Sequence, residues 1–332
     1  MPQIGSTFVA DDQEDPREVS WHPRFATRLV GHDQAIAHFE KAFASGRPHH
    51  AWLIHGPKGI GKATMAYALA RRILGQSNAE QTRRWIEAKA HPDLFVLERQ
   101  LNDSKPRKLK AEISVDDARG LANFLARTAS GWRVVIVDAA DDLNTESGNA
   151  ILKLVEEPPS KALLLLVSSQ PGRLLRTLKS RCLKLGLEPL SSEQAYGIVN
   201  ALPLEPRPTS EDLERSVDQS HGSPGQALAL LTSQGAKAFA RFAALKSAKP
   251  SDYLGIANAL SGRGVGPDEF SIFTALLLDW IANQAKERGS AALAQAHSQI
   301  AEAARIAQGF NLDRKQAVMS QLKLVNDALK AS

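Results

Sequence analysis

A glycine-rich run that contains one lysine is the part of this sequence best suited to bind phosphate. The run Gly56-Pro57-Lys58-Gly59-Ile60-Gly61-Lys62-Ala63 fits the phosphate-loop pattern G-x-x-x-x-G-K-[ST] at every fixed position except the last. Glycines let backbone N–H groups close around phosphate oxygens, and the lysine of this pattern reaches the β- and γ-phosphates. We therefore expect Gly56, Gly59, Gly61 and Lys62 to bind ATP or ADP.

The residue after this lysine departs from the pattern. Ala63 stands where Ser or Thr would hold Mg²⁺, and its side chain has no oxygen to offer. Thr64 comes one residue later, where a helix turns its side chain about 100° away. We place Ala63 and Thr64 in the nucleotide site, which then lacks its usual metal ligand. Two alternatives stay open: a site that holds phosphate but hydrolyses ATP weakly, and a glycine-rich turn that binds nothing.

Two polar residues that follow apolar runs are the next candidates. Residues 133–138 read as a strand that ends in Asp138, where a carboxylate can hold the water shell of Mg²⁺. The glutamate that would activate an attacking water is expected next, but Ala139 occupies that place. Ser168 follows another apolar run, and its hydroxyl could sense a γ-phosphate. The alternatives are a buried strand that ends in a polar turn for Asp138, and local capping for Ser168.

The pattern around these residues predicts the elements that position them. Residues 51–55 read as a short buried strand that enters the glycine-rich run, and an apolar face predicts a helix that leaves it. Further strands are expected at residues 93–98, 133–138, 162–167 and 183–187, with helices from residue 114 and at residues 145–156 and 172–179. Near-continuous apolar strands between helices are typical of a parallel sheet that is covered on both faces.

The sequence after Pro189 reads as helical throughout. Helices are expected from Ser191 or Ser192, from Ser210, at residues 225–231, 253–260, 270–281 and 291–306, and in a last segment around residues 318–329. Residues 248–250 fit a linker. The last segment carries an apolar stripe, Val318, Leu322, Val325 and Leu329, which suits a bundle core or a contact with a neighbouring subunit.

Composition narrows the class of protein. The chain has 332 residues, which suggests two or three domains, and a net charge of +5, which permits contact with nucleic acid without requiring it. The longest apolar run near the middle, residues 162–167, is too short to cross a bilayer, and the N-terminus shows no basic stretch before an apolar core. One cysteine, Cys182, excludes an internal disulfide. We expect a cytoplasmic protein that does not bind a membrane.

Four runs together resemble bacterial clamp-loader subunits of the AAA+ class. They are residues 56–62, the strand ending in Asp138, the run Gly148-Asn149-Ala150-Ile151-Leu152-Lys153-Leu154-Val155-Glu156-Glu157-Pro158-Pro159, and the triplet Ser180-Arg181-Cys182. The resemblance is strong over residues 25–187 and weaker to the end, through Asn311-Leu312-Asp313-Arg314-Lys315-Gln316-Ala317. It implies an α/β protein: an AAA+ domain with a five-stranded parallel sheet at residues 25–188, a small helical lid at 189–247 and an all-α collar domain at 248–332, after a flexible segment 1–24.

The departures from the family pattern indicate a subunit that is not a motor. Ala63 and Ala139 are two of them, and Gly225 stands where a motor subunit would place an arginine on the phosphates. Relatives carry a zinc module, but residues 73–91 contain no cysteine, so no zinc or other metal is expected and His91 is interpreted as a loop or capping histidine. Little ATPase activity of its own is expected, and whether nucleotide binds stays open.

The resemblance implies a function in DNA replication. It implies a stator-like subunit of the DNA polymerase III clamp loader, which helps to load the sliding clamp on primed DNA. The implied partners are the motor (gamma/tau) subunits and the delta subunit, with the clamp and primed DNA reached through the complex and without homo-oligomers. Arg181, with Ser180, is implied to act in trans as an arginine finger on ATP bound to the adjacent motor subunit.

Other interpretations remain beside this one. From the residues alone, Arg181 fits an ordinary surface charge, and the basic loop of residues 105–110 fits either a solvated turn or a contact with phosphate or a partner. The chain could instead be an independent AAA+ ATPase acting on DNA, such as a helicase loader or a recombination motor. That class needs the metal ligand, the catalytic glutamate and the lid arginine, all three of which are replaced. A small-molecule kinase fits poorly, because the long helical C-terminal part carries no signature of a substrate site.

Overall fold

The computed structural model describes residues 15, 17–45, 48–102, 109–126, 131–205, 207–245, 249–262, 265, 268–309 and 313–331. The chain divides into two compact units, Met1–Gln226 and Ala227–Ser332. Most of the expected flexible lead-in, residues 105–108 of the basic loop, residue 248 of the expected linker and residues 311–312 lie outside the described residues. The three-domain boundaries expected from the resemblance stay a prediction.

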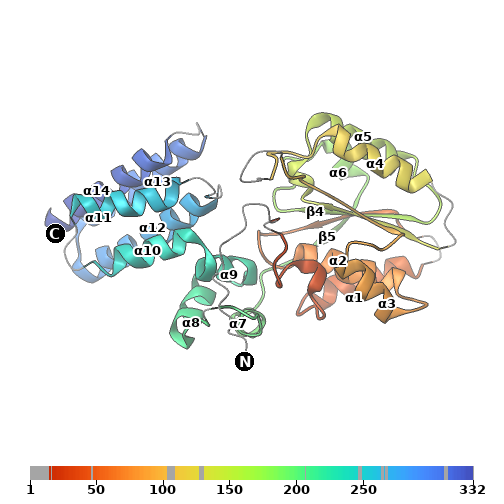
Figure 1. Cartoon of the computed structure of the whole chain (residues 1–332), viewed down its shortest axis with the longest axis horizontal. Helices are drawn as coiled ribbons and strands as arrows, with labels where there is room; N and C mark the ends of the chain where they lie inside the picture. Colours follow the sequence, from red (N-terminus) through yellow and green to blue (C-terminus); the bar gives the residue numbers. More distant parts are fainter. Residues whose placement is uncertain are drawn as a thin grey trace, which may run out of the picture. The chain divides into compact units, whose positions relative to one another are not determined.

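A parallel sheet of five strands forms the centre of the first unit, within the described residues (Figure 1). The strands are β1 (Ala51–His55), β2 (Leu94–Glu98), β3 (Arg133–Asp138), β4 (Ala162–Ser168) and β5 (Leu183–Gly186), in the order β2-β3-β4-β1-β5. Every neighbouring pair is parallel. The three inner strands are apolar on both faces, and all seven residues of β4 are buried. The α/β fold class with a five-stranded parallel sheet, expected from the sequence, is confirmed.

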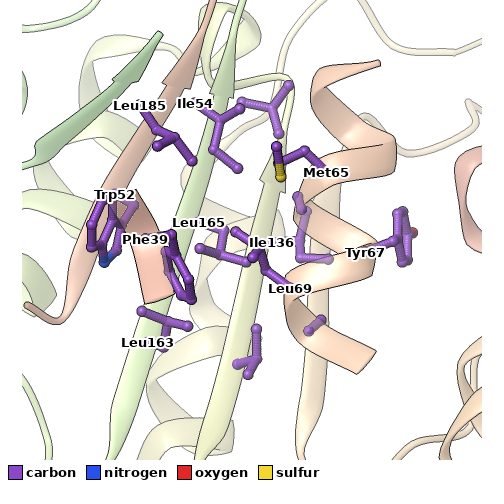
Figure 2. Close-up of a cluster of buried hydrophobic side chains, with 14 of the residues drawn as sticks. Phe39, Trp52, Ile54, Met65, Tyr67, Leu69, Ile136, Leu163, Leu165 and Leu185 are labelled. Carbon is purple, nitrogen blue, oxygen red and sulfur yellow. The ribbon is translucent and has the colours of Figure 1, made fainter. Parts of the chain in front are cut away.

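Two layers of helices cover this sheet, one on each face (Figure 1). The helices α1 (Asp33–Phe43), α2 (Lys62–Leu74) and α3 (Ala79–Glu87) contribute to one apolar core, and α4 (Val115–Ala126), α5 (Thr145–Glu156) and α6 (Arg176–Ser180) to the other. Successive strand residues alternate between the two cores: Leu163 and Leu165 pack on the first face, Leu164 on the second. Figure 2 shows the first core, with Phe39 of α1 beside Trp52 of β1.

Short elements complete the first unit. These are the 3₁₀ turns η1 (Pro23–Phe25) and η2 (Ala140–Asp142), the helices α7 (Ser192–Asn200) and α8 (Ser210–Gln219), and the start of α9 (Pro224–Thr232). The Ser191 hydroxyl accepts from the N–H of Gln194, and the side-chain oxygen of Gln194 accepts from the N–H of Ser191. Helix α7 therefore begins in a capping box. Helix α8 is capped by Thr209, one residue before the serine that the sequence suggested.

The second unit is helical in its described residues. Its elements are the end of α9, α10 (Gln234–Ala243), α11 (Pro250–Ser261), α12 (Asp268–Arg288), α13 (Ala291–Gly309) and α14 (Arg314–Ala331). Val318, Leu322 and Val325 of α14 are fully buried in one apolar core with side chains of the other helices, so most of the predicted stripe serves the bundle core. Within the described part of the chain, no helix is long and apolar enough to cross a membrane.

Candidate functional site

The glycine-rich run forms the turn between β1 and α2, as the sequence predicts. Gly56, Gly59 and Gly61 all have positive φ angles, 151°, 82° and 100°, which L-residues with side chains rarely adopt. Lys62 is the first residue of α2, and Gly61 is its N-cap. The loop therefore lies at the carboxyl end of a central strand and at the amino end of a helix, where backbone N–H groups and the helix dipole favour an anion. Ala63 and Thr64 follow on the first turn of α2 and offer no side-chain oxygen at the usual metal position.

Residues 223–226, at the start of α9, pack directly on this loop. A Cβ atom at Gly59 would lie 2.5 Å from the Ser223 Oγ and 2.9 Å from the Gln226 backbone nitrogen. A Cβ atom at Gly225 would lie 2.8 Å from the Gly59 Cα. Gly225, which the resemblance places at the position of an arginine in motor subunits, therefore lies where two backbones meet.

Hydrogen bonds to loop carbonyls hold this contact together. The Ser223 hydroxyl and the Gln226 side-chain amide donate to the carbonyl oxygen of Lys58, at 2.8 and 3.2 Å. The Gly225 N–H donates to the carbonyl oxygen of Gly59 at 2.9 Å. These bonds use carbonyl oxygens, whereas a phosphate would be bound by N–H groups. The loop is therefore fixed in shape by contacts within its own chain.

The side chain of Lys62 turns back onto the loop. Its ammonium group donates to the carbonyl oxygen of Pro57 at 2.5 Å, and the residue is 5% exposed. Burial lowers the pKa of Lys62, and the carboxylates of Asp141 and Asp138 partly offset that shift. A phosphate at this loop would have to replace the Pro57 carbonyl as the partner of this cation.

Acidic side chains gather at the carboxyl edge of β2 and β3. Asp138, the last residue of β3, lies opposite Glu98, the last residue of β2. Burial raises the pKa of Asp138 to about 6, and the neighbouring charge of Glu98 adds to the rise. Asp138 lies at the carboxyl end of β3, where the charge of Lys62 acts on it, and Ala139 follows it without a carboxylate that could activate water.

Ser168, at the end of β4, is directed toward an aspartate that the sequence did not single out. Its hydroxyl donates to one carboxylate oxygen of Asp141 at 2.5 Å, and the N–H groups of Ser169 and Gln170 donate to the other, at 2.6 and 3.1 Å. Asp141 thus fixes the end of β4, and the contact of Ser168 is with this distant residue, which differs from the local capping named as its alternative. The polar turn after β3 was visible in the sequence, but its role as an anchor depends on the pairing of β3 with β4.

The triplet Ser180-Arg181-Cys182 lies between α6 and β5. Arg181 caps the C-terminus of α6, and the hydroxyl of Ser180 donates to the carbonyl oxygen of Thr177 at 2.9 Å. Cys182 is buried beside Leu178, and burial raises the pKa of its thiol to about 12. A buried cysteine on one side and a helix on the other fix the backbone of Arg181, whose side chain is 43% exposed.

Arg181 and the phosphate loop lie at opposite ends of the strands: Arg181 precedes the amino end of β5, and the loop follows the carboxyl end of β1. Strand β5 begins at Leu183, beside Trp52, and ends at Gly186, beside His55. Arg181 precedes this parallel pair, and Gly56 follows it. At about 3.3 Å per residue, the length of the pair alone separates the two by roughly 10 Å. Arg181 therefore cannot serve the phosphate loop of its own chain.

The guanidinium of Arg181 is held by two groups. One terminal nitrogen, Nη2, lies 2.9 Å from a carboxylate oxygen of Glu156, and Nη1 donates to the Thr177 carbonyl oxygen at 3.1 Å. Glu156 is the last residue of α5 and was noted in the sequence only as part of a motif. Sequence reasoning missed this pair, although both partners stand in runs that it had singled out.

His91 and the possible metal ligands are the remaining candidates from the sequence. His91 accepts from the N–H of Asp93 at 3.1 Å, so it caps a turn as interpreted from the sequence. Among the residues that the structure describes, no group of three or more His, Cys, Asp or Glu side chains could hold a metal ion.

Comparisons with known proteins find that the first unit is similar to DNA polymerase III subunits. Residues 31–191 match the family described as DNA polymerase III, delta subunit. The chain is 38% identical over 185 residues to DNA polymerase III subunit delta' of Pseudomonas aeruginosa, which covers 53% of each chain. It is 36% identical over 204 residues to the subunit of the same name of Escherichia coli, which covers 58% of each.

A solved structure is similar over a larger share of the chain. A DNA polymerase III, gamma subunit-related protein of Thermotoga maritima matches 88% of this chain and 98% of its own, with 14% identity and a TM-score of 0.48. The chain spans about half the length of the curated relatives it matches in sequence. The matched family segment contains the phosphate loop, Asp138, Ser168 and Arg181, so the resemblance inferred from the motifs is confirmed there.

Proposed function

We propose that this chain is the delta-prime subunit of a bacterial DNA polymerase III clamp loader. In this role it is a cytoplasmic, stator-like subunit that assembles with motor (gamma/tau) and delta subunits and helps to load the sliding clamp on primed DNA. The similarity of residues 31–191 to the delta' subunits supports the proposal. In the complex, its Arg181 acts as an arginine finger on ATP bound by a neighbouring subunit.

The placement of Arg181 is the observation that carries this proposal. Its side chain is 43% exposed at the amino edge of the sheet, away from the phosphate loop of its own chain. A planar guanidinium with several N–H donors suits paired hydrogen bonds to phosphate oxygens. Because it cannot reach its own loop, the phosphate that it contacts belongs to another molecule.

The phosphate loop supports a subunit that is not a motor. Hydrolysis in this class of site needs a hydroxyl on Mg²⁺ and a group that orients the attacking water. Ala63 and Ala139 supply neither, and Gly225 leaves the lid without an arginine. An independent AAA+ ATPase acting on DNA would need all three groups, so this alternative is disfavoured.

We expect the isolated protein to hydrolyse ATP negligibly. Ordinary enzymes turn over at about 1 s⁻¹ or faster, and this site lacks both metal positioning and water activation. Phosphate release is measured with the purified chain, with Lys62→Ala beside it and a motor subunit as the active reference. Both forms of this chain should give the same background rate. A rate of about 1 s⁻¹ that Lys62→Ala abolishes would refute the claim of an inactive site.

We also expect the protein to assemble with partners and not with itself. Size-exclusion chromatography with light scattering should give a monomer for the chain alone. Mixed with motor and delta subunits, it should elute in one stable complex that contains all of them. A homohexamer that excludes those subunits would contradict the proposal and favour an independent motor.

A further inference from the structure

We propose that Glu156 is a positioning residue for Arg181, which it holds in a preset orientation for the phosphate of a neighbouring subunit; this inference rests on the proposed arginine finger. The structure places the Glu156 carboxylate 2.9 Å from Nη2 of Arg181. The second contact of the guanidinium goes to the Thr177 carbonyl oxygen through Nη1 at 3.1 Å. Two residues from two helices therefore fix the head of one exposed side chain.

Rigid surroundings allow this pair to set an orientation. Val155, next to Glu156, is 2% exposed, and Leu178, three residues before Arg181, is 1% exposed; both belong to the core between α5, α6 and the sheet. A Cβ atom at Gly148 would lie 3.0 Å from a methyl carbon of Leu175, so the two helices approach closely. The backbones that carry the acid and the arginine are thus held in place by packing.

The position of Glu156 in its helix points to a role beyond helix stability. It is the last residue of α5, and Glu157 is the C-cap. The negative end of the helix dipole lies there, so a cation would stabilise this turn and a carboxylate does not. The favourable electrostatic contact of this carboxylate is with Arg181, which belongs to another element, the C-terminus of α6.

The donors of the arginine permit both contacts at once. A guanidinium has five N–H donors. Glu156 and Thr177 accept one each, which leaves three for a phosphate. A free arginine side chain carries large rotamer entropy, and ordering it in advance lowers the cost of presenting it to a ligand. Glu156 therefore acts through Arg181, without touching the nucleotide.

The test is clamp-stimulated ATP hydrolysis and clamp loading by the reconstituted complex, with this chain as wild type, Glu156→Ala, Arg181→Ala or the double variant. The loss of an exposed ion pair of this kind corresponds to about a two- to fivefold change in rate. We expect Glu156→Ala to lower the loading rate by about that factor, to a value between those of wild type and Arg181→Ala. Glu156→Gln keeps an oxygen that can accept from Arg181, so it should recover part of the loss. Glu157→Ala, a change in the neighbouring exposed carboxylate, should load at the wild-type rate.

The double variant separates positioning from a structural role. If Glu156 acts only through Arg181, removing it from Arg181→Ala should cause no further loss. A double variant that is slower than Arg181→Ala, or a Glu156→Ala variant with wild-type or higher rates, would overturn the inference while the finger stands. Wild-type rates for Arg181→Ala would instead overturn the proposed finger and this inference with it.

Discussion

Arg181→Ala should reduce DNA- and clamp-stimulated ATP hydrolysis and clamp loading by the reconstituted complex, while the variant still folds and assembles. Arginine fingers contribute roughly 10³–10⁵ in rate to related phosphoryl transfers, because the guanidinium offsets charge that grows on the transferred group. In the proposed complex this chain serves one nucleotide site of its neighbour, so the loss at that site should be of this order. Total ATPase falls less, because the other sites keep their own arginines, and loading falls further if it needs every site.

Two companion variants sharpen this result. Arg181→Lys should fail as well, because a point charge cannot reproduce the two parallel N–H groups of the guanidinium. Arg215→Ala is a matched control: Arg215 is also exposed and paired with a glutamate, Glu211 at 2.7 Å, but it lies on α8. It should retain wild-type turnover and loading. Unchanged ATPase and loading in Arg181→Ala would show that Arg181 is an ordinary surface charge.

The strands were the most predictable part of the fold. Continuous apolar runs that end in glycine or a polar turn predicted β1 and β3 with the bounds that the structure has, residues 51–55 and 133–138. Helix α5 also matches its predicted range, 145–156, because Asn144 caps its start by accepting from the Ser147 N–H and Pro158-Pro159 follow its end. Strong local signals are enough to specify the bounds of such elements.

Helices with weaker local signals were predicted poorly. The segment expected at residues 172–179 forms a helix only from Arg176, because the N–H of Arg173 closes a turn onto Gln170 after Pro171. Helices α1, α3 and α10 were not predicted at all. Helix α3 is mainly polar and buries only two side chains, Thr82 and Ile86, so its stability comes from packing more than from its sequence pattern.

The candidate site divides in the same way. Its proposed members came from the sequence: the loop, Asp138 and Ser168 from local patterns, and Arg181 from the family resemblance. Their partners did not: Asp141 for Ser168, the Pro57 carbonyl for Lys62, and Glu156 for Arg181. Each of these contacts depends on how a side chain turns or on which elements the fold brings together. The same holds for Gly225, which the sequence marked only as a missing arginine and the structure places against Gly59.

Gly59→Ala tests that contact and should destabilise the first unit strongly. A side chain at the φ of 82° costs about 1–2 kcal/mol, and overpacking against a neighbouring backbone costs typically about 1–3 kcal/mol more. The added methyl group would lie 2.9 Å from the Gln226 nitrogen, which no rotation of a side chain can relieve. We therefore expect the free energy of unfolding to fall by about 2–5 kcal/mol.

Gly61→Ala supplies the matched comparison within the same loop. Gly61 also has a positive φ, 100°, but the atom nearest to an added Cβ is a His32 nitrogen at 3.8 Å, so only the backbone strain of about 1–2 kcal/mol remains. Urea unfolding followed by tryptophan fluorescence reports mainly on the first unit, which holds Trp21, Trp52, Trp85 and Trp132. The two variants should differ by the overpacking cost. Equal losses in both would mean that residues 223–226 do not press on the loop, and that the glycine at position 225 has another cause than this close approach.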